Sequence, residues 1–375
     1  MSRKQFLLIL AVLVVLAAAA GGVALSDRSY WSSADARAGQ KALPGLKISE
    51  VAEIAIQDAS GGLHLRRGPS GWTIRERADF AADTDRVAGM LVKLAEVKVV
   101  QSEPLVESQR ARLELVEPKD KAAGAGTAVE LKDAKGAVLG RLLLGKKIMK
   151  GSAMASLGRP EADATGRYLV AGGDQTVLAV GDPLLQAEAK VQDWLVKDLL
   201  RVEGTKTVTS SKGWTATRNT EGMDWKLAGS GQGPDLQKAT DLASSLGWVN
   251  LVDVVADPAK ADTGLDHPVT IQAQTFDGLK YTLNVGKQVD SNYYLRFAVA
   301  GEPAKTRPAV KGEKAEDKAK NDKAFEERRK KLVEKVDGEK KLAAWTSLVS
   351  KTSVDPLLRD RAQLMPEKKK PARKT

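Results

Sequence analysis

The feature that most constrains this chain is an internal repeat, because five segments recur in the same order in its two halves. The first half contains GWTIRE (71–76), DTDRVAGMLVKLAEV (83–97), LVEP (115–118), VELKDAKGAVLGRLLLGK (129–146) and RYLVAG (167–172). The second half contains MDWKLAG (223–229), DLQKATDLASSLGWV (235–249), LDHP (265–268), VTIQAQTFDGLKYTLNVGK (269–287) and YYLRFA (293–298). Self-similarity in a fixed order is typical of repeated structural units. The sequence therefore predicts a tandem duplication.

Each copy combines strand-like and helix-like patterns. The segment VAEIAIQ (51–57) alternates apolar and polar residues, turns at DASGG and returns as LHLRR, which predicts a hairpin. Asp83 is placed to cap a helix whose apolar positions are Val87, Met90, Leu91, Leu94 and Val97. In the second copy we match them with Leu236, Ala239, Ala243 and Leu246. We predict an α+β fold in which each β-rich unit has hairpins and one main helix.

The stretch GRLLLGKK (140–147) resembles the phosphate loop G-x-x-x-x-G-K-[ST] at every fixed position except the last. Lys147 stands where that motif needs a hydroxyl for magnesium. The second copy keeps Gly286 and Lys287 but not the upstream glycine. A spacing that differs between the copies does not hold phosphate in both, so we interpret Gly145 and Gly286 as structural residues at the ends of strands.

Four further residues recur at equivalent places in the two copies. Trp72 and Trp225 are predicted to be core anchors, and Pro118 and Pro268 close the L-x-x-P turns. The chain has no cysteine and only two histidines, which leaves little material for thiol chemistry or an imidazole-based metal site. We predict no catalytic, cofactor-binding or metal-ligating residues.

The N-terminus predicts a membrane anchor. Phe6 to Leu25 is a run of 20 residues without a charge, long enough to span the hydrocarbon core as a helix. Arg3 and Lys4 precede it, which favours a cytoplasmic N-terminus and export of the remainder. The alternative is a cleaved signal peptide, because the Ala- and Gly-rich second half of the run offers cleavage sites. We expect a single-pass protein of the inner (cytoplasmic) membrane with its C-terminal domain in the periplasm or outside the cell.

The C-terminal part carries most of the positive charge. Residues 301–375 contain 22 Lys or Arg and 13 Asp or Glu, whereas the whole chain has a net charge of +11. We predict a Lys-rich helical or disordered tail, in which LAAWTSLV (342–349) and PLL (356–358) are apolar enough to dock. An exported tail meets lipid or protein, so no nucleic-acid partner is expected. The predicted boundaries are 1–27 for the cytoplasmic stub and anchor, 28–44 for a linker, 45–200 and 201–303 for the repeats, and 304–375 for the tail.

The order of these motifs resembles a bacterial family. An N-terminal span, V-x-x-I-x-I, G-W-x-I, a capped helix, an L-x-x-P turn, strands ending L-G-K and a Y-L-V strand resemble domain of unknown function 4340 over residues 45 to 300. The resemblance implies an exported, membrane-anchored protein, often encoded beside ABC transporters of the gliding-motility auxiliary type. It implies no catalytic residues. The turn GLDHP (264–268) keeps the glycine that LVEP lacks, and the Lys-rich tail lies outside the resemblance.

Two functions from different classes follow. The favoured hypothesis is a non-enzymatic, membrane-anchored accessory or scaffold protein of the cell envelope that binds a transporter, a polymer or another envelope protein. The rival is an envelope enzyme such as a glycan hydrolase, whose carboxylates the sequence does not identify. A cleft with two carboxylates about 5–10 Å apart would favour the rival.

Overall fold

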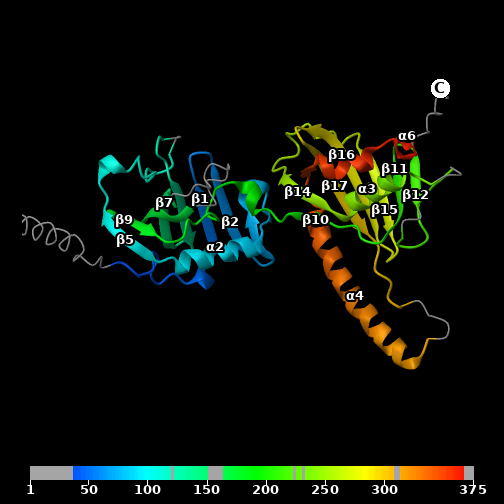
Figure 1. Cartoon of the computed structure of the whole chain (residues 1–375), viewed down its shortest axis with the longest axis horizontal. Coiled ribbons are helices and arrows are strands. Elements are labelled where there is room, and N and C mark those ends of the chain that lie inside the picture. The colour runs from blue at the N-terminus through cyan, green and yellow to red at the C-terminus, as the bar shows by residue number, and fades with distance from the viewer. Residues whose placement is uncertain are drawn as a thin grey trace, which may run out of the picture. The chain divides into compact units, whose positions relative to one another are not determined.

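The computed structural model describes residues 37–119, 122–150, 164–222, 225–229, 233–307 and 313–366 (Figure 1). It has an α+β fold, as predicted, with two nine-stranded sheets whose paired strands are antiparallel. The chain divides into two compact units, Met1–Gly62 with Ala88–Ala189, and Leu63–Val87 with Lys190–Thr375. The segment 63–87 therefore packs with the second half of the chain, although its strands belong to the first sheet.

The first sheet has the order β4-β3-β2-β1-β6-β7-β8-β9-β5. Its strands are β1 Glu53–Gln57, β2 Gly62–Gly68, β3 Gly71–Ile74, β4 Phe80–Ala81, β5 Val99–Pro104, β6 Thr127–Lys132, β7 Val138–Met149, β8 Ala164–Ala171 and β9 Thr176–Val180. Alternation decides which side chains enter the core: Ile54 and Ile56 of β1 are buried, whereas Gln57 is exposed. The turn at 133–136 joins β6 to β7, and Asp133 Oδ1 accepts the Lys135 backbone N–H at 2.8 Å.

The second sheet has the order β10-β14-β18-β17-β16-β15-β11-β12-β13. Its strands are β10 Asp198–Leu200, β11 Thr205–Ser210, β12 Trp214–Thr217, β13 Lys226–Leu227, β14 Val249–Val254, β15 Val269–Thr275, β16 Lys280–Val289, β17 Asn292–Ala300 and β18 Ser347–Ser350. Short 3₁₀ helices in the chain are η1 Ile48–Glu50, η2 Arg75–Arg77, η3 Glu107–Gln109, η6 Val191–Trp194 and η7 Asp355–Leu358. The core face of the sheet holds Tyr281, Leu283 and Val285 of β16 at alternate positions.

One main helix accompanies each sheet. In α2 (Thr84–Glu96) the expected positions are buried, and Asp83 Oδ1 accepts the Arg86 backbone N–H at 3.0 Å as a cap. In α3 (Leu236–Gly247), Asp235 caps the helix and the buried residues are Ala239, Leu242, Ser245 and Leu246. The expectation that Leu236 faces the core was wrong, since its side chain is 63% exposed. Leu236 corresponds in the repeat to Thr84, the first helical residue, and not to Val87.

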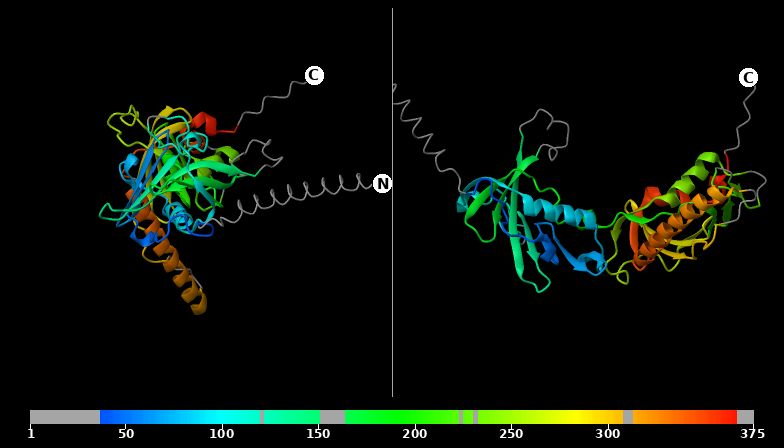
Figure 2. Two further views of the ribbon diagram at one scale, coloured as in Figure 1. Left: turned by 90° about the vertical axis from the view of Figure 1, so that its left-hand side faces the viewer. Right: turned by 90° about the horizontal axis from the view of Figure 1, so that it is seen from below.

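The segment predicted as a tail contains part of the second sheet. Helix α4 (Ala315–Leu342) projects from the second unit, as Figures 1 and 2 show, and it is followed by β18, α5 (Lys351–Val354) and α6 (Arg361–Leu364). Strand β18 pairs with both β17 and β14. A boundary at residue 303 would therefore separate β17 from its neighbour, because the sheet continues past α4.

A repeated tetrapeptide marks the same point of both sheets. Asp-Pro-Leu-Leu occurs at 182–185, after β9, and again at 355–358, after β18. In each copy the first leucine is buried: Leu184 is 2% exposed and Leu357 is 0% exposed. This signal lies outside the five segments used to identify the repeat, and it would have extended the second copy past α4.

No helix among the described residues is long and apolar enough to cross a bilayer. The expected anchor, Phe6 to Leu25, lies outside the described residues.

Candidate functional site

The Gly-Lys pair of the phosphate-loop pattern forms a bulge in the first sheet. The register between β7 and β8 shifts between Leu144 and Lys147. At this point the Lys146 backbone N–H donates to Leu113 O at 2.7 Å. A Cβ on Gly145 would collide with the same carbonyl and would lie 2.7 Å from Leu115 Cδ2. The glycine therefore permits the close approach of the 113–115 segment, and the Lys146 amide that a phosphate would need is already bonded.

The second sheet repeats this geometry. The register between β16 and β17 shifts between Val285 and Gln288, and the Lys287 backbone N–H donates to Thr263 O at 2.8 Å. A Cβ on Gly286 would collide with that carbonyl. In each copy the L-x-x-P segment crosses the strand at a glycine, so both glycines have a packing role.

The remaining recurrent residues also lie in structural positions. Trp72 is 7% exposed and Trp225 is 4% exposed. The guanidinium of Arg218 lies 4.8 Å from the ring centroid of Trp225, and its Nε donates to Thr205 O at 2.6 Å. Burial lowers the pKa of Arg218 from its ordinary value. Pro118 is buried and Pro268 is half-buried.

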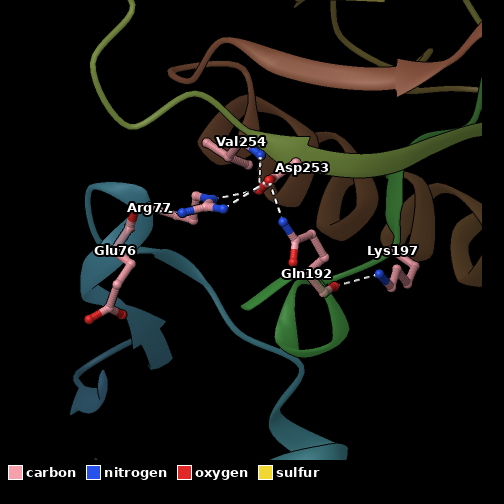
Figure 3. Close-up of polar contacts among 6 residues, drawn as sticks. All are labelled: Glu76, Arg77, Gln192, Lys197, Asp253 and Val254. Carbon is pink, nitrogen blue, oxygen red and sulfur yellow. Dashed lines mark hydrogen bonds and ion pairs between the residues drawn. The ribbon is translucent and has the colours of Figure 1, made fainter. Parts of the chain in front are cut away.

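A partly buried ion pair joins the 75–77 turn to β14 within the second unit. Arg77 donates from Nε and Nη2 to the two Asp253 carboxylate oxygens at 2.5 and 2.8 Å (Figure 3). Gln192 Nε2 and the Val254 backbone N–H add bonds of 2.9 and 2.7 Å to the same carboxylate. Burial raises the pKa of Asp253, but the hydrogen bonds and the Arg77 charge outweigh it and hold the pKa below its usual value. An ionised carboxylate with four donors is a structural clamp, not a general base.

A second buried network holds α4 to the sheet. Tyr281 OH donates to Glu339 Oε2 at 2.8 Å, while Lys335 Nζ lies 3.0 Å from Glu339 Oε1 and 3.1 Å from Tyr281 OH. Burial raises the pKa of Tyr281 far above its ordinary value, and the Glu339 charge raises it further. The phenol therefore stays protonated as a donor and anchors the C-terminal end of α4.

The two histidines form no shared site. His64, on β2, has its Nδ1 2.6 Å from Glu76 Oε1 in η2, and His267 is exposed in its turn. Across the described ranges, no group of three or more His, Cys, Asp or Glu side chains is arranged to hold a metal ion.

The candidate binding site is a hollow of about 440 Å³ on the first unit, which we call the β5 groove. Its lining is Val100, Gln101, Glu103, Pro104, Gln109, Arg112, Leu113, Ile148, Thr165, Gly166, Tyr168, Val177, Ala179, Val180 and Gly181. The 105–115 segment forms one wall, because Leu113 and Leu115 pack against Val170 and Val177 of β8 and β9. Val100 is 64% exposed. Apolar walls with a few polar groups are typical of recognition sites.

Residues 39–42 pair with the start of β5, a strand that lines the groove. The Val99 backbone N–H donates to Gln40 O at 2.9 Å, so residues 39–42 run along β5. Arg37 Nη1 lies 2.7 Å from Asp174 Oδ2, in the turn between β8 and β9. Sequence patterns predicted no binding residue in this groove, and Tyr168 was noted only as part of the repeated RYLVAG strand. The lining comes from strands and a loop whose sequences show no site motif.

Comparison with known proteins identifies a family. The family model described as Domain of unknown function (DUF4340) matches residues 72–268, which is more than half of the 375 residues. No curated protein and no solved structure matches this chain.

Proposed function

The chain belongs to the family of domain of unknown function 4340, and on this premise we propose that it is a non-enzymatic, membrane-anchored accessory protein of the cell envelope. In this proposal the β5 groove receives a segment of a membrane-embedded partner, such as an ABC transporter of the gliding-motility auxiliary type. The observation that carries the proposal is that residues 39–42, which follow the expected anchor closely, run along β5, a strand that lines the groove.

The reach of the chain limits where the groove can act. Eleven residues lie between Leu25, the end of the expected anchor, and Arg37, so the two Cα atoms are twelve residue steps apart. At about 3.3–3.6 Å per residue they span at most roughly 40 Å. A groove tethered this closely to the bilayer meets membrane proteins at a high effective concentration.

The rival, a glycan hydrolase, needs two carboxylates facing one cleft. The β5 groove has one, Glu103. Asp253 and Glu339, the carboxylates of the two partly or fully buried networks, are engaged by donors that hold loops and helices in place.

A second hollow of about 400 Å³, beside α4, is lined by three carboxylates, Glu203, Asp277 and Glu327. Arg328 pairs with Asp277 at 3.0 Å, and Lys331 and Lys335 also line this hollow. The proposal of a binding protein therefore rests on the β5 groove.

We also infer that the two sheets arose by duplication. The strand order β3-β2-β1-β6-β7-β8-β9-β5 corresponds, element by element along the chain, to β13-β12-β11-β15-β16-β17-β18-β14. The bulges at Gly145 and Gly286 and the two Asp-Pro-Leu-Leu segments occupy equivalent places in this order. In the second copy, α4 is an insertion between β17 and β18, the strands that correspond to the hairpin β8–β9.

The anchor is tested by topology. A reporter that is active only after export, fused after Thr375, should be active, and the protein should stay with membranes after a carbonate wash. Activity of a cytoplasmic reporter at the same position would contradict the proposed topology. Release by the wash would favour a cleaved signal peptide.

The groove is tested by photo-crosslinking in cells. A benzoylphenylalanine at Val100, in the groove, should crosslink to an integral-membrane subunit of an ABC transporter. The matched control is Val138, which is 56% exposed in the same unit but does not line the groove. Crosslinks of equal yield at both positions, or none at Val100 in a correctly localised protein, would exclude the groove as the docking site.

A further inference from the structure

An exposed tryptophan stands at the C-terminal end of α3. Trp248 is 51% exposed, although tryptophan is a residue that usually lies largely buried. The guanidinium of Arg201 lies 3.8 Å from the centroid of its ring, and Asp198 holds Arg201 through an ion pair of 2.7 Å. The stacked guanidinium fixes the orientation of the indole, so the ring is a rigid, preorganised surface.

The fold does not require an aromatic residue at this position. In the internal repeat, Trp248 corresponds to Glu96 of the first copy. Glu96 is also exposed, and it pairs with Lys41 at 2.8 Å from the segment beside β5. In the first unit, the charged pair Glu96–Lys41 therefore stands where Trp248 and Arg201 stand in the second unit. Because the fold accepts a charged pair there, the indole of Trp248 needs an explanation other than folding.

Trp248 forms one wall of a shallow hollow of about 400 Å³ between α3 and the α5–η7 segment. The other lining residues are Asp241, Ser244, Ser245, Thr352, Ser353 and Pro356. Five of these six side chains carry a hydroxyl or a carboxylate. The hollow therefore presents one aromatic surface surrounded by short hydrogen-bonding groups and Pro356.

Asp241 is the charged group of the hollow. Its Oδ1 accepts from Gln237 Nε2 and its Oδ2 accepts from Arg359 Nη2, both at 2.9 Å. These two bonds lower the pKa of Asp241, which keeps the carboxylate ionised near neutral pH. An ionised carboxylate held in place is a strong acceptor for ligand hydroxyls.

We propose that this hollow is a saccharide-binding site in which a sugar ring stacks on Trp248 and its hydroxyls bond to Asp241 and the neighbouring Ser and Thr side chains. A sugar has the required chemistry, because its C–H face is apolar and its rim is made of hydroxyls. A peptide hot spot instead needs a desolvated pocket for a large apolar side chain, which the hydroxyl-lined hollow does not offer. The site lies in the second unit and does not depend on the β5 groove or its partner.

The test uses the full-length protein in detergent, labelled with 5-fluorotryptophan, and two probes, chitotriose and maltotriose. At least one probe should shift the fluorine resonance of Trp248, which is assigned from its absence in Trp248→Phe. By calorimetry, Trp248→Ala should weaken binding at least about tenfold, which equals about 1.4 kcal/mol, and Trp248→Phe should weaken it less.

Leu236→Ala is the matched control, since Leu236 is 63% exposed on the same helix but does not line the hollow. It should change the affinity by less than about twofold. Binding of neither probe at about 10 mM, or equal binding by wild type and a folded Trp248→Ala, would overturn the proposal. Unchanged thermal melting of Trp248→Ala shows that a loss of binding does not come from unfolding.

Discussion

The substitution Gly145→Ala tests the packing role of the Gly-Lys bulge most directly. The added Cβ would collide with Leu113 O, and it would lie 2.7 Å from Leu115 Cδ2. The obstructing atom is a backbone carbonyl and Leu115 is fully buried, so neither can move aside through a rotamer change alone. The 113–115 segment must shift instead, and its 2.7 Å hydrogen bond with Lys146 N must lengthen or break.

The expected loss follows from these contacts. Overpacking of a dense site costs about 1–3 kcal/mol. Loss of one hydrogen bond adds about 0.5–1.5 kcal/mol. The lower entropy of the unfolded alanine chain offsets about 0.4–1 kcal/mol. The free energy of unfolding should therefore fall by about 0.5–4 kcal/mol, measured by urea denaturation followed by circular dichroism.

The matched control is Gly89→Ala in the same unit. Gly89 lies within α2, and a Cβ there would meet nothing within 4 Å. Because alanine favours a helix interior over glycine by about 1 kcal/mol, this variant should gain stability. A Gly145→Ala protein as stable as wild type, alongside a stabilised Gly89→Ala, would refute the close-approach explanation of the bulge.

Three other predictions concern single side chains. Trp72→Ala and Trp225→Ala should each lower the free energy of unfolding by about 3–5 kcal/mol, and a variant that melts like wild type would contradict the core role of that tryptophan. The pKa of Asp253 is lower in the folded state than in the unfolded state. Its ion pair with Arg77 therefore stabilises the fold fully above the unfolded pKa of about 3.9. This stabilisation is lost as the pH falls through the folded-state pKa. Asp253→Asn should therefore be less stable at pH 7 and should lose less stability than wild type between pH 5 and 2, as urea titrations at each pH would show. Lys146→Ala should leave folding unchanged because the side chain is exposed, and ATP binding by the wild type that this variant abolishes would overturn the structural interpretation of the glycine-lysine pair.

The repeat made much of the fold predictable. A local pattern is enough to predict an element whose own sequence shows its period. In α2 the apolar positions recur every three or four residues and are buried as expected. The hairpin β6–β7 can also be recognised from the sequence, because Asp133 and Gly136 are residues typical of a turn. These features depend on short-range geometry, which a sequence displays directly.

Three other features depend on long-range packing. Strand β18 is only four residues long and follows a charged helix, so nothing local distinguishes it from a docked tail. The exposure of Leu236 depends on where α3 begins relative to the sheet, and the apolar character of this residue does not show where the helix begins. The β5 groove was not predictable for the same reason: its shape comes from a loop folded over β8 and β9. Two of these had an overlooked signal: the second Asp-Pro-Leu-Leu segment for β18, and the alignment of Leu236 with Thr84 in the repeat.

Because β18 lies close to the C-terminus, the second sheet can be completed only late in the synthesis of the chain. Strands β14 and β17 flank β18 and have no direct pairing with each other, so the sheet stays in two pieces until residues 347–350 arrive. A chain that emerges from its N-terminus can complete the first sheet while the second still exposes two unpaired edges. Intermediates of synthesis or transport that stop within α4 should therefore be the forms most open to proteolysis and most in need of a chaperone.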